Sequence, residues 1–130
     1  MADSSKNTVI TVAGRKKICQ ARAGAITLPT IEGMAFGSGG VDSSGTVIAP
    51  SEAQTALTNE LYRKKVDGYT FPEETAVRYT CTLTASELAG KEISEIGLYD
   101  TDGDIVAIKT FSRKGKDDDM EQQYVLDDIF

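Results

Sequence analysis

Polar and apolar residues alternate regularly between positions 76 and 83 of the chain. One face of this segment carries Val77, Tyr79, Cys81 and Leu83. Arginine and threonine side chains occupy the other face. A period of two residues is typical of a β-strand with one buried face and one face in water. The pattern therefore predicts an antiparallel strand here.

Two further apolar stretches, residues 93–99 and 105–111, flank the run Asp-Thr-Asp-Gly-Asp at 100–104. Short acidic residues and glycine favour tight turns, so this region is predicted to be a β-hairpin. Apolar residues fall on both faces of the second arm, which is typical of a central strand. Residues 31–36 and 121–130 are two more predicted strands.

Helices are predicted at two places. Residues 15–23 are rich in helix formers, with Thr8 or Thr11 as the N-cap and Gly24 as the end. A second short helix is predicted over residues 53–63. We expect an α+β fold, an antiparallel β-rich meander or sandwich with one or two short helices. Residues 1–10 are expected to be a flexible leader, and residues 11–130 a single domain.

A glycine- and serine-rich segment, residues 37–51, is the longest predicted loop. Its start, Gly-Ser-Gly-Gly, lacks the lysine that a phosphate-binding P-loop requires and the helix that a dinucleotide site requires. A flexible connection is the simplest interpretation. A loop that docks a partner is the functional alternative.

The composition narrows the possible functions. The 130 residues carry a net charge of −6, and the basic residues form only short separate clusters, so nucleic-acid binding is not expected. No apolar stretch reaches the roughly 18 residues of a membrane span, and no secretory signal is visible at the start. We therefore expect no membrane insertion, and synthesis and assembly in a cytoplasm.

Histidine is absent and only two cysteines are present, Cys19 and Cys81. These facts exclude Ser-His-Asp and Cys-His catalytic sets, zinc sites that contain histidine, and a four-cysteine zinc site. Both cysteines are expected to be buried thiols. The chain is predicted not to be an enzyme, with no catalytic residues and no bound cofactor.

Three aspartates at alternate positions, Asp100, Asp102 and Asp104, have a spacing that can bind calcium when a loop wraps the ion. The glycine and glutamate that complete an EF-hand are missing. The alternative is a hairpin turn stabilised by local hydrogen bonds. The turn is the favoured interpretation, and no metal site is predicted.

Two segments resemble a known family. The run EIGLYDTDGDIVAI at 95–108 and the run QTALTNELYR at 54–63 resemble segments of the N-terminal domain of phage tail-collar fibre proteins. The resemblance spans most of the chain, from about residues 13–15 through residues 34–37 to near Lys109. The two main runs stand in the family's order, about 30 residues apart.

The resemblance implies a structural protein of the virion tail. Members of this family form the tail-proximal part of fibres on contractile phage tails and related tail-like particles, and such fibres usually trimerise. We expect a component that attaches tail fibres to the baseplate or forms part of it, in a homo-oligomer with a trimer favoured. Its partners would be other tail or baseplate proteins and the fibre.

The chain stops at Phe130, soon after the resembling region. We expect either a short stand-alone baseplate component or the base of a longer fibre. The alternative function, outside this family, is a small soluble binding module that uses the 37–51 loop.

Partner-docking candidates come from three places, which are the 37–51 loop, the 54–63 segment and the last predicted strand. The 54–63 segment is also compatible with a solvated helix face whose leucines pack on the core. The last strand offers an exposed edge for pairing with another chain. The docking candidates are Gly37, Gly39 and Gly40 in the loop, Asn59, Glu60, Tyr62 and Arg63 in the 54–63 segment, and Tyr124 and Phe130 in the last strand.

Overall fold

The structure is a computed structural model that describes residues 7–130. It contains one α-helix and eight β-strands in this range. In chain order the elements are β1 (Thr8–Ile10), α1 (Val12–Arg22), β2 (Ile31–Gly37), β3 (Glu60–Lys65), β4 (Gly68–Glu73), β5 (Ala76–Leu83), β6 (Glu92–Asp100), β7 (Ile105–Gly115) and β8 (Gln122–Ile129).

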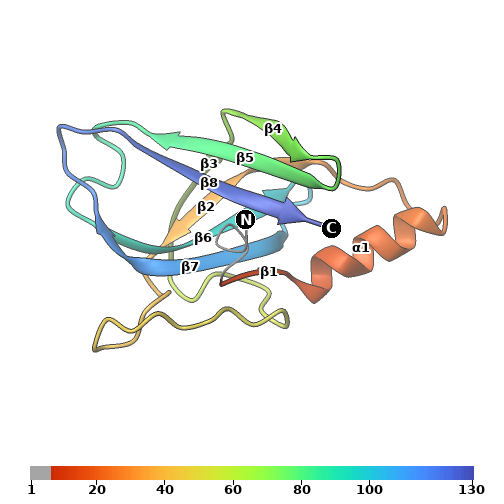
Figure 1. The fold of residues 1–130 in the computed structure, drawn as a ribbon, viewed down its shortest axis with the longest axis horizontal. Coiled ribbons are helices and arrows are strands. Elements are labelled where there is room, and N and C mark those ends of the chain that lie inside the picture. Colours follow the sequence, from red (N-terminus) through yellow and green to blue (C-terminus); the bar gives the residue numbers. More distant parts are fainter. Residues whose placement is uncertain (1–6) are drawn as a thin grey trace.

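The strands form two antiparallel sheets. The larger has the order β1-β7-β6-β2-β3, and the smaller has the order β4-β5-β8. The β6–β7 and β4–β5 pairs are hairpins, whereas β2–β6 and β5–β8 join strands far apart in the sequence. Figure 1 shows the smaller sheet lying across the larger one, with α1 at one end of the molecule. The predicted α+β, antiparallel β-rich sandwich is confirmed.

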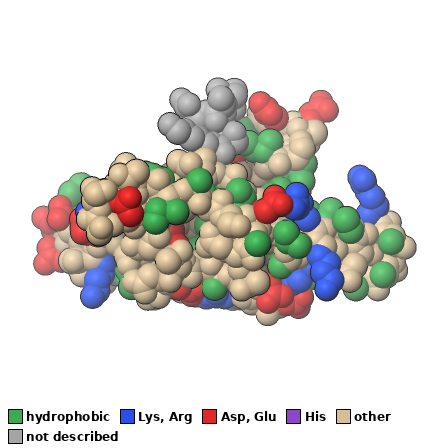
Figure 2. All heavy atoms as spheres, turned by 90° about the horizontal axis from the view of Figure 1, so that it is seen from below, with side chains coloured by type: hydrophobic (Ala, Val, Ile, Leu, Met, Phe, Trp, Pro, Cys, Tyr) green, Lys and Arg blue, Asp and Glu red, His purple; other side chains and the backbone are tan. Residues whose placement is uncertain are grey.

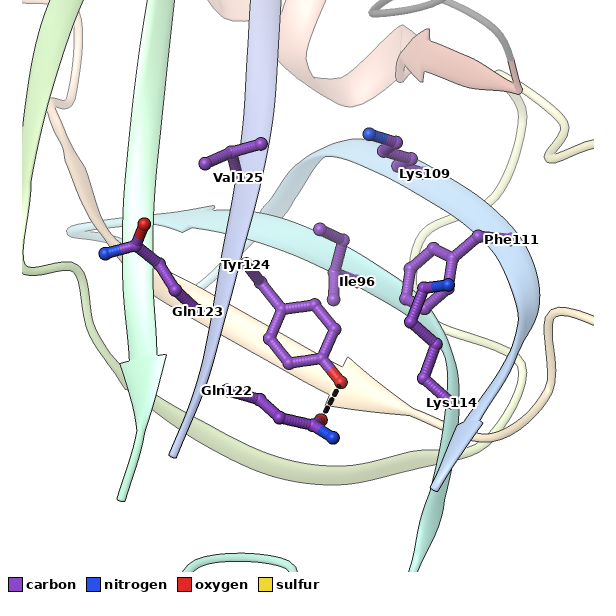
Figure 3. Close-up of a pocket in the computed structure, with 8 residues that line it drawn as sticks. All are labelled: Ile96, Lys109, Phe111, Lys114, Gln122, Gln123, Tyr124 and Val125. Atoms are coloured by element: carbon purple, nitrogen blue, oxygen red, sulfur yellow. Dashed lines mark hydrogen bonds between the residues drawn. The ribbon is translucent and has the colours of Figure 1, made fainter. Parts of the chain in front are cut away.

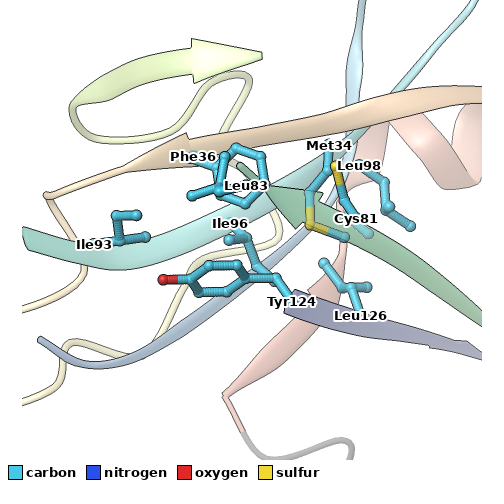
Figure 4. Close-up of a cluster of buried hydrophobic side chains, with 10 residues drawn as sticks. Met34, Phe36, Cys81, Leu83, Ile93, Ile96, Leu98, Tyr124 and Leu126 are labelled. Carbon is cyan, nitrogen blue, oxygen red and sulfur yellow. The ribbon is translucent and has the colours of Figure 1, made fainter. Parts of the chain in front are cut away.

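The main core lies between the two sheets (Figure 4). Phe36 and Tyr124 meet edge to face across it, with ring centroids 5.3 Å apart. Both sheets supply its members, which are Met34, Phe36, Ile93, Ile96, Leu98 and Ala107 from the larger and Cys81, Leu83, Tyr124 and Leu126 from the smaller. The alternation predicted for residues 76–83 therefore points its apolar face into this core.

The helix α1 begins where its cap residue is held by the sheet. Thr11 Oγ1 accepts the backbone N–H of Gly14 at 3.1 Å and donates to the carbonyl of Ile105 at 3.0 Å. Gly24, with a φ of 82°, follows the last turn. The predicted helix is confirmed, with Thr11 as its N-cap. In the described range, no helix is long and apolar enough to cross a membrane.

The predicted second helix over residues 53–63 is wrong. Turns run from residue 52 to residue 59, and β3 begins at Glu60. Threonine and asparagine are weak helix formers, and a short helix has little stability of its own. The backbone amides of Thr58 and Asn59 are instead bound by a side chain of β6, described below.

The predicted leader overlaps a strand. Residues 1–6 of it lie outside the described residues. Residues 8–10 form β1, which pairs with β7 in the register Ile10 to Ala107. The other predicted strands are confirmed as β2, β5, β6, β7 and β8.

Candidate functional site

The carboxylate of Glu95, on β6, holds the long 38–59 loop against the larger sheet. Its Oε2 accepts the backbone N–H of Gly39 and of Asn59, both at 2.8 Å, and its Oε1 accepts that of Thr58 at 2.9 Å. Glu95 is 1% exposed. A buried carboxylate is tolerated because these three donors replace its hydration.

Ser94, the residue before Glu95, also binds the loop. Ser94 Oγ accepts the N–H of Gly40 at 2.9 Å, and the carbonyl of Gly40 accepts the N–H of Ile48 at 2.8 Å. A Cβ on Gly40 would lie 1.9 Å from the carbonyl oxygen of Ser94, so only glycine allows this approach. Gly37 and Gly39 also border Glu95. These glycines and Asn59 therefore make contacts that shape the loop itself.

The two segments that carry the family resemblance meet at a second point. Arg63 Nε and Nη2 donate to Glu60 at 2.7 and 3.0 Å, and Nη1 donates to the carbonyl of Gly103 at 3.0 Å. The guanidinium carbon also lies 4.7 Å from the ring centroid of Tyr99. Arg63 thus joins β3 to the β6–β7 turn.

The three aspartates of that turn surround a lysine. Lys17 Nζ lies 2.6 Å from Asp100, 2.7 Å from Asp104 and 3.1 Å from Asp102. Burial lowers the pKa of Lys17, but the hydrogen bonds to these carboxylates raise it well above its usual value. Asp100 Oδ1 also accepts the backbone N–H groups of Asp102 and Asp104, so the predicted turn is confirmed. The ammonium of Lys17 supplies the positive charge that the cluster requires.

Tyr62 lies on β3, at one edge of the larger sheet. Its side chain is 36% exposed, and its hydroxyl donates to Glu87. Lys64 Nζ reaches the same carboxylate at 2.7 Å. Burial raises the pKa of Glu87, but the hydrogen bonds from Lys64 and Tyr62 lower it to about 2. Tyr62 is thus anchored at its hydroxyl while part of its ring faces water.

Among the strands of residues 7–130, β8 pairs with β5 alone, so no described strand pairs with its other edge. A groove of about 400 Å³ lies along that edge, between β8 and the far end of β7 (Figure 3). Tyr124 lines it but is only 7% exposed, and its hydroxyl is 2.7 Å from Gln122 Oε1. The predicted exposed edge is therefore present, while Tyr124 itself belongs mainly to the core.

Large apolar side chains are exposed at the end of the molecule that carries α1. Tyr69 is 62% exposed, Phe71 66% and Phe130 62%. Phe130 therefore does not cap the core. Tyr69 and Phe71 were not among the predicted docking residues, although two aromatic residues two positions apart and followed by a proline were a visible signal.

One of the two cysteines differs from the prediction. Cys81 is buried, and burial raises the pKa of its thiol to about 12. Cys19 is exposed on α1, so the expectation of two buried thiols is wrong for this residue. Its position on the helix faces away from β7, onto which α1 packs through Gly14.

Charged side chains are mixed over the face that carries β1, α1 and the 38–59 loop. In Figure 2, Lys and Arg side chains appear singly among acidic and apolar ones. A nucleic-acid-binding surface would present a continuous basic stripe, and this face has none among the described residues.

Comparison with known proteins identifies the family to which this chain belongs. The chain matches the family described as "Phage tail-collar fibre protein, N-terminal" over residues 3–127. No curated protein and no solved structure matches it. Because the match spans nearly the whole chain, the protein belongs to this family and is a structural component of a phage tail.

Proposed function

We propose that this member of the tail-collar fibre family is a fibre-base module that attaches tail fibres to the baseplate of a contractile phage tail or tail-like particle, or forms part of that baseplate. Its mechanism is binding geometry without chemistry. The protein would be made and assembled in the host cytoplasm, act as a homo-oligomer with a trimer favoured, and contact other tail proteins.

One contrast carries this proposal. Polar groups of the 95–108 segment are engaged within the fold, since Glu95 binds the loop amides and the Asp100–Asp104 cluster binds Lys17. The exposed features are aromatic side chains at one end and a free strand edge. Surfaces of this kind suit assembly, because aromatic anchors and strand edges recur in protein interfaces.

Among the docking candidates, we propose Tyr62, Glu60 and Phe130 as contacts with neighbouring proteins, since their side chains reach the surface. Gly37, Gly39, Gly40 and Asn59 would act indirectly, by shaping the loop. Arg63 would fix β3 in place. Tyr124 would support the β8 edge from the core side.

The experiment is localisation in assembled particles. A copy with an affinity tag is expressed in cells that produce the tail, and purified particles are labelled with gold against the tag. We expect the label where fibres leave the baseplate. A label at the distal fibre tips, or along the tail sheath, would contradict the proposal. A tagged sheath protein serves as the positional control.

A further inference from the structure

An apolar cavity of about 580 Å³ lies beside the exposed aromatic residues. It lies between α1, the segment before β2, and the ends of β4, β5 and β8. Its principal walls are Ile18, Leu28, Tyr69, Phe71 and Tyr79, with Asp128 from β8 and Phe130 just after it. We call this cavity the apolar cup.

The aromatic walls of the cup are assembled, yet they stay open to water. Tyr69 and Phe71 lie edge to face with centroids 5.6 Å apart, and Tyr69 lies 6.2 Å from Tyr79 across the β4–β5 ladder. Leu28, opposite them, is 45% exposed. Exposed apolar side chains gathered in one patch mark a surface that another molecule covers.

Asp128 is an acidic residue at a position of this cup where an apolar side chain is expected. Residues 124, 126 and 128 of β8 share one face, and the first two enter the core. Asp128 therefore points inward where the pattern calls for an apolar side chain. Its Oδ1 is buried and has no hydrogen-bond partner among the described residues.

The remaining charges of the cup do not neutralise this carboxylate. Lys17 and Asp100 also line the cavity, but they pair with each other at 2.6 Å. Asp127, the preceding residue, lies on the other face of β8, where it is 4% exposed and binds Arg78 at 2.8 Å. Within residues 7–130, Asp128 is thus an acidic group without its own cation, surrounded by apolar walls, and leaving such a group unpaired is unfavourable.

We propose that the apolar cup docks a segment of another tail protein in which an arginine is flanked by apolar residues. This inference rests on the proposed function and names the chemistry of the partner. The guanidinium would lie against Asp128, its alkyl stem along Leu28, and its planar face on Tyr69 or Phe71. A chain with net charge −6 also attracts a basic segment at long range.

The test uses two short probe peptides. Acetyl-Leu-Arg-Leu-amide and the same peptide with citrulline in place of arginine are titrated into the ¹⁵N-labelled protein, and amide shifts are followed by NMR. Citrulline keeps the size and the planar head group but has no charge. We expect shifts at residues 69, 71 and 128, with arginine bound about fivefold more tightly than citrulline.

Variants show whether Asp128 is responsible. In D128N the preference for arginine over citrulline should disappear while weak binding of both peptides remains. D118N makes the same charge change in the exposed 117–119 turn and should keep the preference. Equal binding of the two peptides to the native protein, or loss of the preference in D118N as well, would overturn the proposal.

Two further outcomes also overturn it. If the cup residues shift with protein concentration alone, the occupant is a second copy of this chain. If gold-labelled D128N and F71S chains reach the fibre base as well as the native chain does, the cup is not the docking surface, although the proposed function stands. A native chain absent from the tail would instead remove the proposed function.

Discussion

Asp128 makes the stability of the protein depend on pH. Burial raises the pKa of its carboxyl from 3.8 to about 6. Between these two values the folded chain binds more protons than the unfolded chain, so the free energy of unfolding falls as the pH rises through this window. Asp128→Asn removes this loss. We predict that the variant is more stable than the native protein by about 2 kcal/mol at pH 7, and nearly equal to it at pH 4. Urea unfolding at both values checks this; a difference independent of pH would contradict it.

Unlike the carboxylate of Asp128, the buried carboxylate of Glu95 stabilises the fold, because all of its partners are hydrogen-bond donors. Glu95→Ala leaves the amides of Gly39, Thr58 and Asn59 without an acceptor, and we predict a loss of about 3 kcal/mol in unfolding free energy. Glu95→Gln keeps one acceptor oxygen and should lose about half as much. Hydrogen exchange should show faster exchange of these three amides in both variants. Equal stability of Glu95→Ala and the native chain would show that water replaces the carboxylate.

The 38–59 loop depends on one close backbone approach. In Gly40→Ala the new Cβ would meet the Ser94 carbonyl at 1.9 Å, so the loop must detach locally. We predict a loss of about 3 kcal/mol and rapid exchange of the Ile48 amide, whose acceptor is Gly40. Gly68→Ala is the control, because a Cβ there has nothing within 4 Å, and it should change stability by less than about 0.5 kcal/mol. Similar losses in both variants would contradict the close-approach argument.

Elements fixed by local chemistry were predictable, whereas those fixed by distant partners were not. The β6–β7 turn is built by Asp100 with its own neighbours, and α1 by its cap, so pattern and composition sufficed. The 53–63 segment failed because Glu95, 37 residues from Thr58 in sequence, binds its amides. Asp128 was equally hidden. Its inward direction matters only because the cup exists, and most of the cup is built by residues far from it in the sequence.

The assembled fold leaves two kinds of unfilled surface, and they support different contacts. The apolar cup suits a side chain, whereas the β8 edge suits another strand. Phe130 N–H donates to Thr75 at 2.9 Å, so by antiparallel alternation the N–H of Val125 points away from β5. A ring of three copies also requires two different surfaces on each copy, since a head-to-tail interface is not self-complementary.

The proposed trimer can therefore be tested by removing one backbone group, the N–H of Val125. Light scattering of the native protein should give about 42 kDa, three times the 13.9 kDa of one chain. Val125→Pro removes the outward N–H without breaking a bond to β5, so it should give a monomer that keeps its fold. Val125→Ala trims the same side chain, keeps the N–H and should remain a trimer.

A native dimer would instead indicate self-complementary pairing, for example of two β8 edges, and a native monomer would contradict self-assembly. If Val125→Pro stays trimeric, the interface lies elsewhere and the β8 edge is left for the fibre or the baseplate.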